Sequence, residues 1–168
     1  MKFVRKYIWS YDTIISIIIS FVCMCFLPDY IGGELVKDLL GMGIGVLSII
    51  FSIFFAALAF IISASDDEFV SFLEKKGLFT KLINTFRWTV GSLFFALFYS
   101  ILLYVVTAFR LSLNSTFQIS EILMVIFCFM FFYSLLATIE STNDAIRYSK
   151  TRITFVELMK QNGNEQQE

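Results

Sequence analysis

The stretch LLGMGIGVLSIIFSIFFAALAFIISA, residues 39–64, carries no charge and decides the fold of this chain. At about 1.5 Å of rise per residue, a helix of this length crosses roughly 30 Å of hydrocarbon. Small residues recur along it at steps of 4, 3, 4, 4, 3 and 4, forming a small-residue stripe of Gly41, Gly45, Ser48, Ser52, Ala56, Ala59 and Ser63. This eleven-residue repeat keeps the stripe on one side of the helix, where backbones can approach closely. The stripe is therefore either a packing seam or the wall of a pore.

The composition extends the membrane prediction to most of the chain. Of 168 residues, 58% are hydrophobic and only 16% are charged, which is far from a soluble domain. Long uncharged windows predict an all-α, four-helix membrane bundle over 1–139, with spans at about 10–28, 39–64, 88–109 and 121–139. Membrane lipid is the first partner that this composition implies.

The basic residues predict the orientation, because Lys and Arg accumulate on the cytoplasmic side of short loops. Eleven of the 13 flank the inner ends of the spans, and only Lys37 and Arg110 lie in the two outer loops. Both termini are therefore expected in the cytoplasm, with the protein in a plasma membrane. The net charge of −1 gives no general attraction to nucleic acid.

Two segments outside the spans have helical patterns. Residues 65–87 predict an amphipathic elbow at the inner membrane surface, with caps and acidic residues at its start and Gly77 ending its first helix. The elbow either covers the end of the bundle or links a gate to the striped helix. Residues 140–168 predict a helical cytoplasmic tail, because Ile139, Ile146 and Ile153 recur every seven residues.

The stripe is not unique, which keeps both of its interpretations open. The first span carries a smaller face of Thr13, Ser16, Ser20 and Cys23, and the third carries Ser92, Ala96 and Ser100. The Phe-rich fourth span shows no such face. Additional seams favour packing of small residues within one subunit, whereas a water path would have to run between subunits of an oligomer.

The residue types exclude most chemistry. The chain has no histidine, no Walker loop and no dinucleotide-binding glycine pattern, so we expect no enzyme and no cofactor. The three cysteines lie in apolar segments, and we expect no metal site. No charge lies at the centre of a span, which argues against a proton-coupled transporter.

The tail offers one candidate site for a ligand or partner. Arg147, Lys150 and Arg152 could contact a nucleic-acid phosphate, an anionic headgroup or a protein. Solvated helix charge is the simpler explanation, since Asp144 and Glu157 flank them.

This plan resembles the small membrane components of bacterial antiphage defence systems. Four spans, both ends inside, an elbow reading Ser65-Asp66-Asp67-Glu68-Phe69 and a helical tail are similar to the Hailong transmembrane effector and the Kiwa membrane subunit. The resemblance covers the architecture of most of the chain and transfers no functional residue. It implies a homo-oligomer, a tetramer, in the bacterial inner membrane, with a protein or nucleic-acid signal on the cytoplasmic side.

Two functions follow as hypotheses. The first is an oligomeric channel or pore-forming effector in antiviral defence, gated from the cytoplasm, which depolarises the membrane when open. The second is a non-conducting anchor or sensor subunit that recruits a cytoplasmic partner through its tail.

Overall fold

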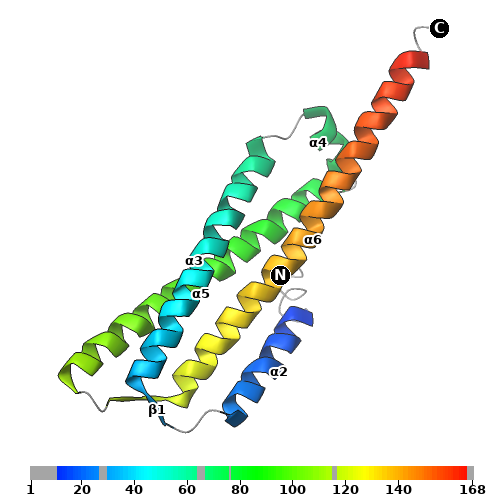
Figure 1. Cartoon of the computed structure of the whole chain (residues 1–168). Coiled ribbons are helices and arrows are strands. Elements are labelled where there is room, and N and C mark those ends of the chain that lie inside the picture. The colour runs from blue at the N-terminus through cyan, green and yellow to red at the C-terminus, as the bar shows by residue number, and fades with distance from the viewer. Residues whose placement is uncertain (1–10, 27–29, 64–66, 76, 115–116, 166–168) are drawn as a thin grey trace.

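The computed structural model describes residues 11–26, 30–63, 67–75, 77–114 and 117–165 of the chain. Within them the fold is helical apart from one short pair of strands (Figure 1). The elements are α2 Tyr11–Phe26, β1 Tyr30–Gly32, α3 Gly33–Ser63, α4 Asp67–Glu74, α5 Leu78–Leu113, β2 Gln118–Ser120 and α6 Glu121–Glu165. The ends of the first predicted span, the start of the elbow and residues 166–168 of the tail lie outside the described residues.

Three helices, α3, α5 and α6, are long and apolar enough to cross a membrane. The fourth apolar helix, α2, is shorter at 16 residues. The protein is thus an all-helical, membrane-spanning chain. The striped helix is longer than predicted and begins at Gly33, with Glu34 in its first turn, where a negative charge suits the helix dipole.

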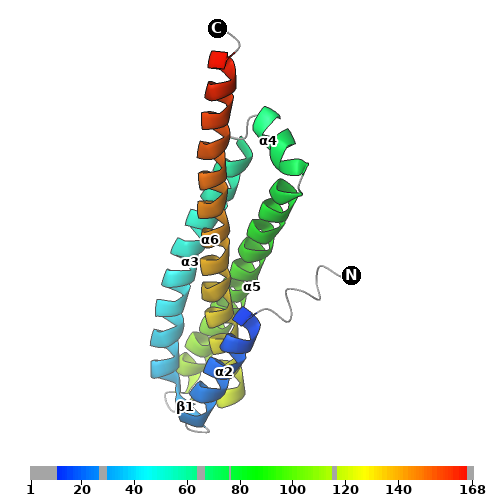
Figure 2. The same ribbon diagram turned by 90° about the vertical axis from the view of Figure 1, so that its right-hand side faces the viewer.

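The long helices form an open row rather than a ring. α3 packs along α5, α5 along α6, and α6 along α2, so that α2 and α3 lie on opposite sides of the row (Figures 1 and 2). α3 also meets α6 near the strands, where Val36, Leu40 and Phe127 share a buried cluster. Both α2 and α3 are edge helices, and each leaves most of its circumference free of the rest of the chain.

The two predicted outer loops are not independent of each other. Their strands pair in antiparallel register, with Tyr30 opposite Ser120 and Gly32 opposite Gln118. The Gly33 amide donates to the Phe117 carbonyl oxygen at 3.0 Å, and a Cβ on Gly33 would lie only 2.9 Å from that oxygen. This ribbon joins the beginnings of α3 and α6 at the end of the molecule away from α4 (Figure 1).

The predicted elbow is divided differently in the structure. Its first helix, α4, ends before Gly77, whose φ of 63° suits glycine and turns the chain, as the sequence predicts. Residues 78–87 do not form a separate surface helix, since α5 continues through Trp88 to Leu113. Their apolar side packs on protein instead of lipid, because Phe86 is 2% exposed and its ring centroid lies 5.7 Å from that of Phe54.

The apolar side of α4 rests on the long final helix. Phe69 and Leu73 are each 2% exposed. The Phe69 ring centroid lies 5.4 Å from those of both Tyr148 and Phe155 on α6. At the turn, Glu74 accepts hydrogen bonds from the Thr80 amide and hydroxyl, capping α5. These contacts match the interpretation in which α4 covers the end of the bundle.

Candidate functional site

The small-residue stripe lies on the uncovered side of α3. Gly41, Gly45, Ser52, Ala56, Ala59 and Ser63 are exposed, and Ser48 is half-buried. The buried positions of the same helix are Gly33, Val36, Leu40, Gly43 and Leu47. At about 100° per residue, most of these residues fall on the side of the helix opposite the stripe. Packing of the stripe within the chain is therefore wrong as an explanation of this face.

The stripe serines bond to their own helix. Ser48 donates to the Gly45 carbonyl oxygen at 3.0 Å, Ser52 to that of Ser48 at 2.9 Å, and Ser63 to that of Phe60 at 3.2 Å. Each hydroxyl oxygen retains acceptor capacity, because a hydroxyl offers two lone pairs beside its one donor. The face can therefore lie against hydrocarbon without an unpaired donor, and it can still accept a bond from water or a cation.

Besides Gly33, Gly43 is the glycine of this helix that close packing requires, and the sequence analysis did not single it out. A Cβ at position 43 would lie 2.6 Å from Cζ of Phe127, a distance that real Cβ contacts do not show. A Cβ at Gly45 would meet nothing within 4 Å. The signal was present in the spacing, because Gly43 lies outside the stripe and in register with Leu40 and Leu47.

The smaller faces of the other helices do pack within the chain. Ser16 and Ser20 of α2 are buried where this helix meets α6, and Ala96 and Ser100 of α5 are buried as well. The prediction that the last span has no small face is wrong. It buries Ser134, Ala137, Thr138 and Ser141, beginning two residues after Phe132.

Ser134 and Ser141 bind α5 through their side-chain hydroxyls. Thr89 of α5 contacts the Ser141 hydroxyl and donates to the Ala137 carbonyl oxygen at 3.3 Å. Ser134 donates to the Ser92 carbonyl oxygen, also at 3.3 Å. Such bonds hold helices together where the hydrophobic effect is weak.

The basic residues of the tail do not form one site. Arg147, Lys150 and Arg152 are all exposed on α6. At about 100° per residue, Arg152 lies on the other side of the helix from Lys150. Arg147 borders a hollow, a space of about 80 Å³ that it shares with Asp144 and Tyr148 of α6 and with Leu73 and Lys81.

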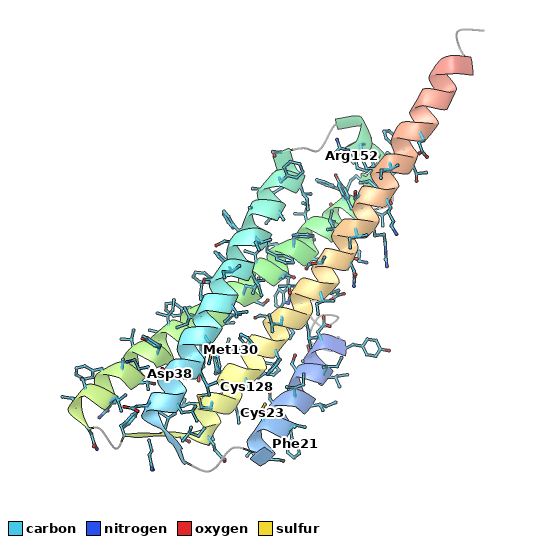
Figure 3. All side chains as sticks on the ribbon, in the orientation of Figure 1. Phe21, Cys23, Asp38, Cys128, Met130 and Arg152 are labelled. Atoms are coloured by element: carbon cyan, nitrogen blue, oxygen red, sulfur yellow. The ribbon has the colours of Figure 1, made fainter. Side chains whose placement is uncertain are left out.

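No metal centre is formed by the described residues, among which no group of three His, Cys, Asp or Glu side chains could hold an ion. Cys23 and Cys128 lie beside each other where α2 meets α6, and their thiols interact (Figure 3). Both cysteines are free. The pair marks the contact between these two helices.

Two carboxyl groups meet at the other end of the same contact. Glu140, one residue beyond the predicted fourth span, shares a hydrogen bond with Asp12 of α2. Burial, this bond and the charges of Asp12 and Asp144 raise the pKa of Glu140, while Lys81 acts in the opposite direction.

We expect Glu140→Gln to remove a pH dependence of stability. Folding raises the pKa of Glu140. Its contribution to the free energy of unfolding is therefore present below the ordinary carboxyl pKa and is lost as pH rises through the pKa of the folded state. The wild-type melting temperature in detergent should therefore fall between pH 4 and pH 8 relative to that of Glu140→Gln. The corresponding difference in the free energy of unfolding should be small, about 0.5 kcal/mol, because the Glu140 side chain is only partly buried and is largely exposed to solvent. Glu157→Gln, on an exposed position of α6, should retain the wild-type profile.

No protein-family model matches this chain, and no curated protein or solved structure was found to be similar to it.

Proposed function

We propose that this protein is a homo-oligomeric membrane channel in which the stripes of several α3 helices face a common axis. The observation that carries the proposal is the exposure of the stripe on the side of α3 that the rest of the chain leaves uncovered. Gly, Ala and Ser at these positions let neighbouring backbones approach closely, which is the main source of helix association in lipid. Serine oxygens along the same face supply acceptors for water or a passing cation.

The row of helices suits such an assembly. α3 is an edge helix, so a second copy could reach its stripe without displacing any helix of the first. We propose that α2, paired with α6 along its length, is the fourth span. Its short length is compatible with a locally thinned bilayer or with residues that flank the helix. The charge bias of the loops supports termini on the cytoplasmic side.

We expect Ser52→Phe to abolish both assembly and conductance. Ser52 is exposed at the middle of the stripe, and a phenyl ring there would separate the facing backbones. The mass of the purified complex in detergent and its conductance in a planar bilayer measure the two effects. Ile53→Phe is the matched control, because Ile53 is 60% exposed but lies off the stripe. A monomeric wild type, or a Ser52→Phe variant that conducts normally, would contradict the channel.

A second candidate is a non-conducting anchor or sensor for a cytoplasmic partner. It is favoured by the length of α6, which continues beyond the other helices to Glu165 (Figure 2). The repeating Ile139, Ile146 and Ile153 are 58%, 50% and 58% exposed, so the chain leaves this face open. An oligomer that assembles through the stripe but carries no current would support the anchor. The role in antiphage defence that the resemblance implies is part of the channel proposal. Comparing the survival of phage-infected cells with and without the protein tests this role.

A further inference from the structure

A groove between α5 and α6 lies apart from the stripe. It has a volume of about 790 Å³, which falls within the range of small-ligand sites. Gly91 forms part of its wall, and a Cβ there would meet nothing within 4 Å. The Trp88 indole, which donates to the Tyr133 hydroxyl at 2.9 Å, bridges the two helices that form the groove. Because Gly91 has no side chain, space remains near the Trp88–Tyr133 pair that connects the two helices.

The groove changes from polar to apolar along its length. Asn84 and Arg87 line it near the α4 end, one turn before the Thr89 contact with Ser141. Phe95 of α5 and Phe129 and Met130 of α6 line the other end. Phe129 precedes Glu140 by eleven residues, a rise of about 16 Å, or half the hydrocarbon thickness. The polar end therefore lies at a membrane boundary and the apolar end near the midplane.

The groove opens to the outside of the helix row. Phe95 is 64% exposed and Trp88 is 41% exposed, although both line the groove. Trp and Tyr side chains prefer the depth of lipid headgroups, with their rings in hydrocarbon and their polar atoms toward water. A molecule could therefore enter sideways from the bilayer.

We propose that this groove binds one anionic phospholipid from the leaflet on the α4 side. Its phosphate would contact the Arg87 guanidinium and the Asn84 amide, and an acyl chain would lie on Phe95, Phe129 and Met130. Charge complementarity supports a lipid with a net negative charge, because Arg87 is exposed and forms no ion pair within the described part of the chain. The site is independent of the proposed channel and requires only insertion in a membrane.

Native mass spectrometry of the full chain measures this binding. The protein is released from detergent with phosphatidylglycerol or with phosphatidylcholine, and bound lipids are counted per protomer. We expect one retained phosphatidylglycerol and about tenfold weaker retention of phosphatidylcholine, because the choline ammonium offsets the negative phosphate charge that Arg87 would attract. Arg87→Gln should remove this preference, whereas Arg110→Gln, an exposed arginine at the other end of α5, should keep it.

Filling the groove provides the second arm. Gly91→Phe should exclude either lipid, and Ile53→Phe, on an exposed position of α3 that lies off the stripe, should retain phosphatidylglycerol. Inorganic phosphate should not displace the lipid, because it lacks the acyl chain. Equal retention of the two lipids by the wild type would indicate ordinary boundary lipid and overturn the proposal. Unchanged lipid retention in Gly91→Phe, an unchanged preference for phosphatidylglycerol in Arg87→Gln, or no lipid on the wild type would also overturn it.

Discussion

Gly43→Leu should destabilise the protomer by about 3 kcal/mol, at the upper end of the effect of adding bulk to a packed core. The new Cβ would be 2.6 Å from Cζ of Phe127, a ring that is 7% exposed and packed in the buried cluster with Val36 and Leu40. Unfolding in a denaturing detergent, followed by circular dichroism, measures the loss. The protein concentration should be low enough to dissociate any oligomer, so that only the contact of α3 with α6 is tested.

Two variants separate this clash from a general effect of substituting glycine. Gly45→Leu makes the same change two residues away, where a Cβ meets nothing within 4 Å, and should shift stability by about 0.5 kcal/mol or less. Phe127→Ala should be destabilising alone but should recover part of the stability in combination with Gly43→Leu. If Gly43→Leu and Gly45→Leu were equally stable, the close approach of α3 and α6 would be wrong.

Phe69→Ala should release α4 from α6. The Phe69 ring is 2% exposed and contacts both Tyr148 and Phe155, so its removal should weaken docking by about 3 kcal/mol. At eight residues, α4 is too short to be a stable helix by itself, so undocking amounts to unfolding. Amide hydrogen exchange within α4 should accelerate by about a hundredfold, which corresponds to that loss of free energy.

The change in exchange should be confined to the α4 region. Ser71→Ala is the control, because Ser71 is exposed on the same helix and alanine favours helix formation. It should leave exchange in α4 near the wild-type rate. Equal acceleration throughout α3, α5 and α6 would instead show that Phe69 supports the whole fold, and unchanged exchange in α4 would contradict the docking.

The helices could be predicted from the sequence because their signals are local. Uncharged windows located α3, α5 and α6, and Gly77 marked the end of α4. The two strands could not be predicted, since they consist of three residues each. They form only because Tyr30 and Ser120, which are far apart in the sequence, lie opposite each other in the fold. The continuity of α5 was not predicted, because the amphipathic pattern around Phe86 fits a helix on the membrane surface and a helix packed on protein equally well. The contact of Phe86 with Phe54, a residue distant in the sequence, shows that this side of α5 packs on protein.

In the candidate site, too, local features could be predicted from the sequence and long-range contacts could not. The sequence analysis correctly placed the stripe on one face of a single helix, because helical periodicity alone determines that. It could not tell whether this face is covered, since faces of small residues on α2 and α5 look similar and are buried. The buried side of α3 includes Gly43, which lies beside Phe127 of α6, and the sequence alone does not show such a long-range contact. The groove at Gly91 could not be predicted from the sequence either, because it forms between two helices.

The paired strands join the beginnings of α3 and α6 at the end of the molecule away from α4, so they fix the spacing of these two helices at that end. α3 extends from the strands for 31 residues, a length of about 46 Å. A tilt of about 5° about the strands would displace its far end by about 4 Å, somewhat more than the diameter of a water molecule, about 2.8 Å. In the proposed oligomer, small rearrangements near α4 would therefore change the spacing between copies most at Ser63 and least at Gly41.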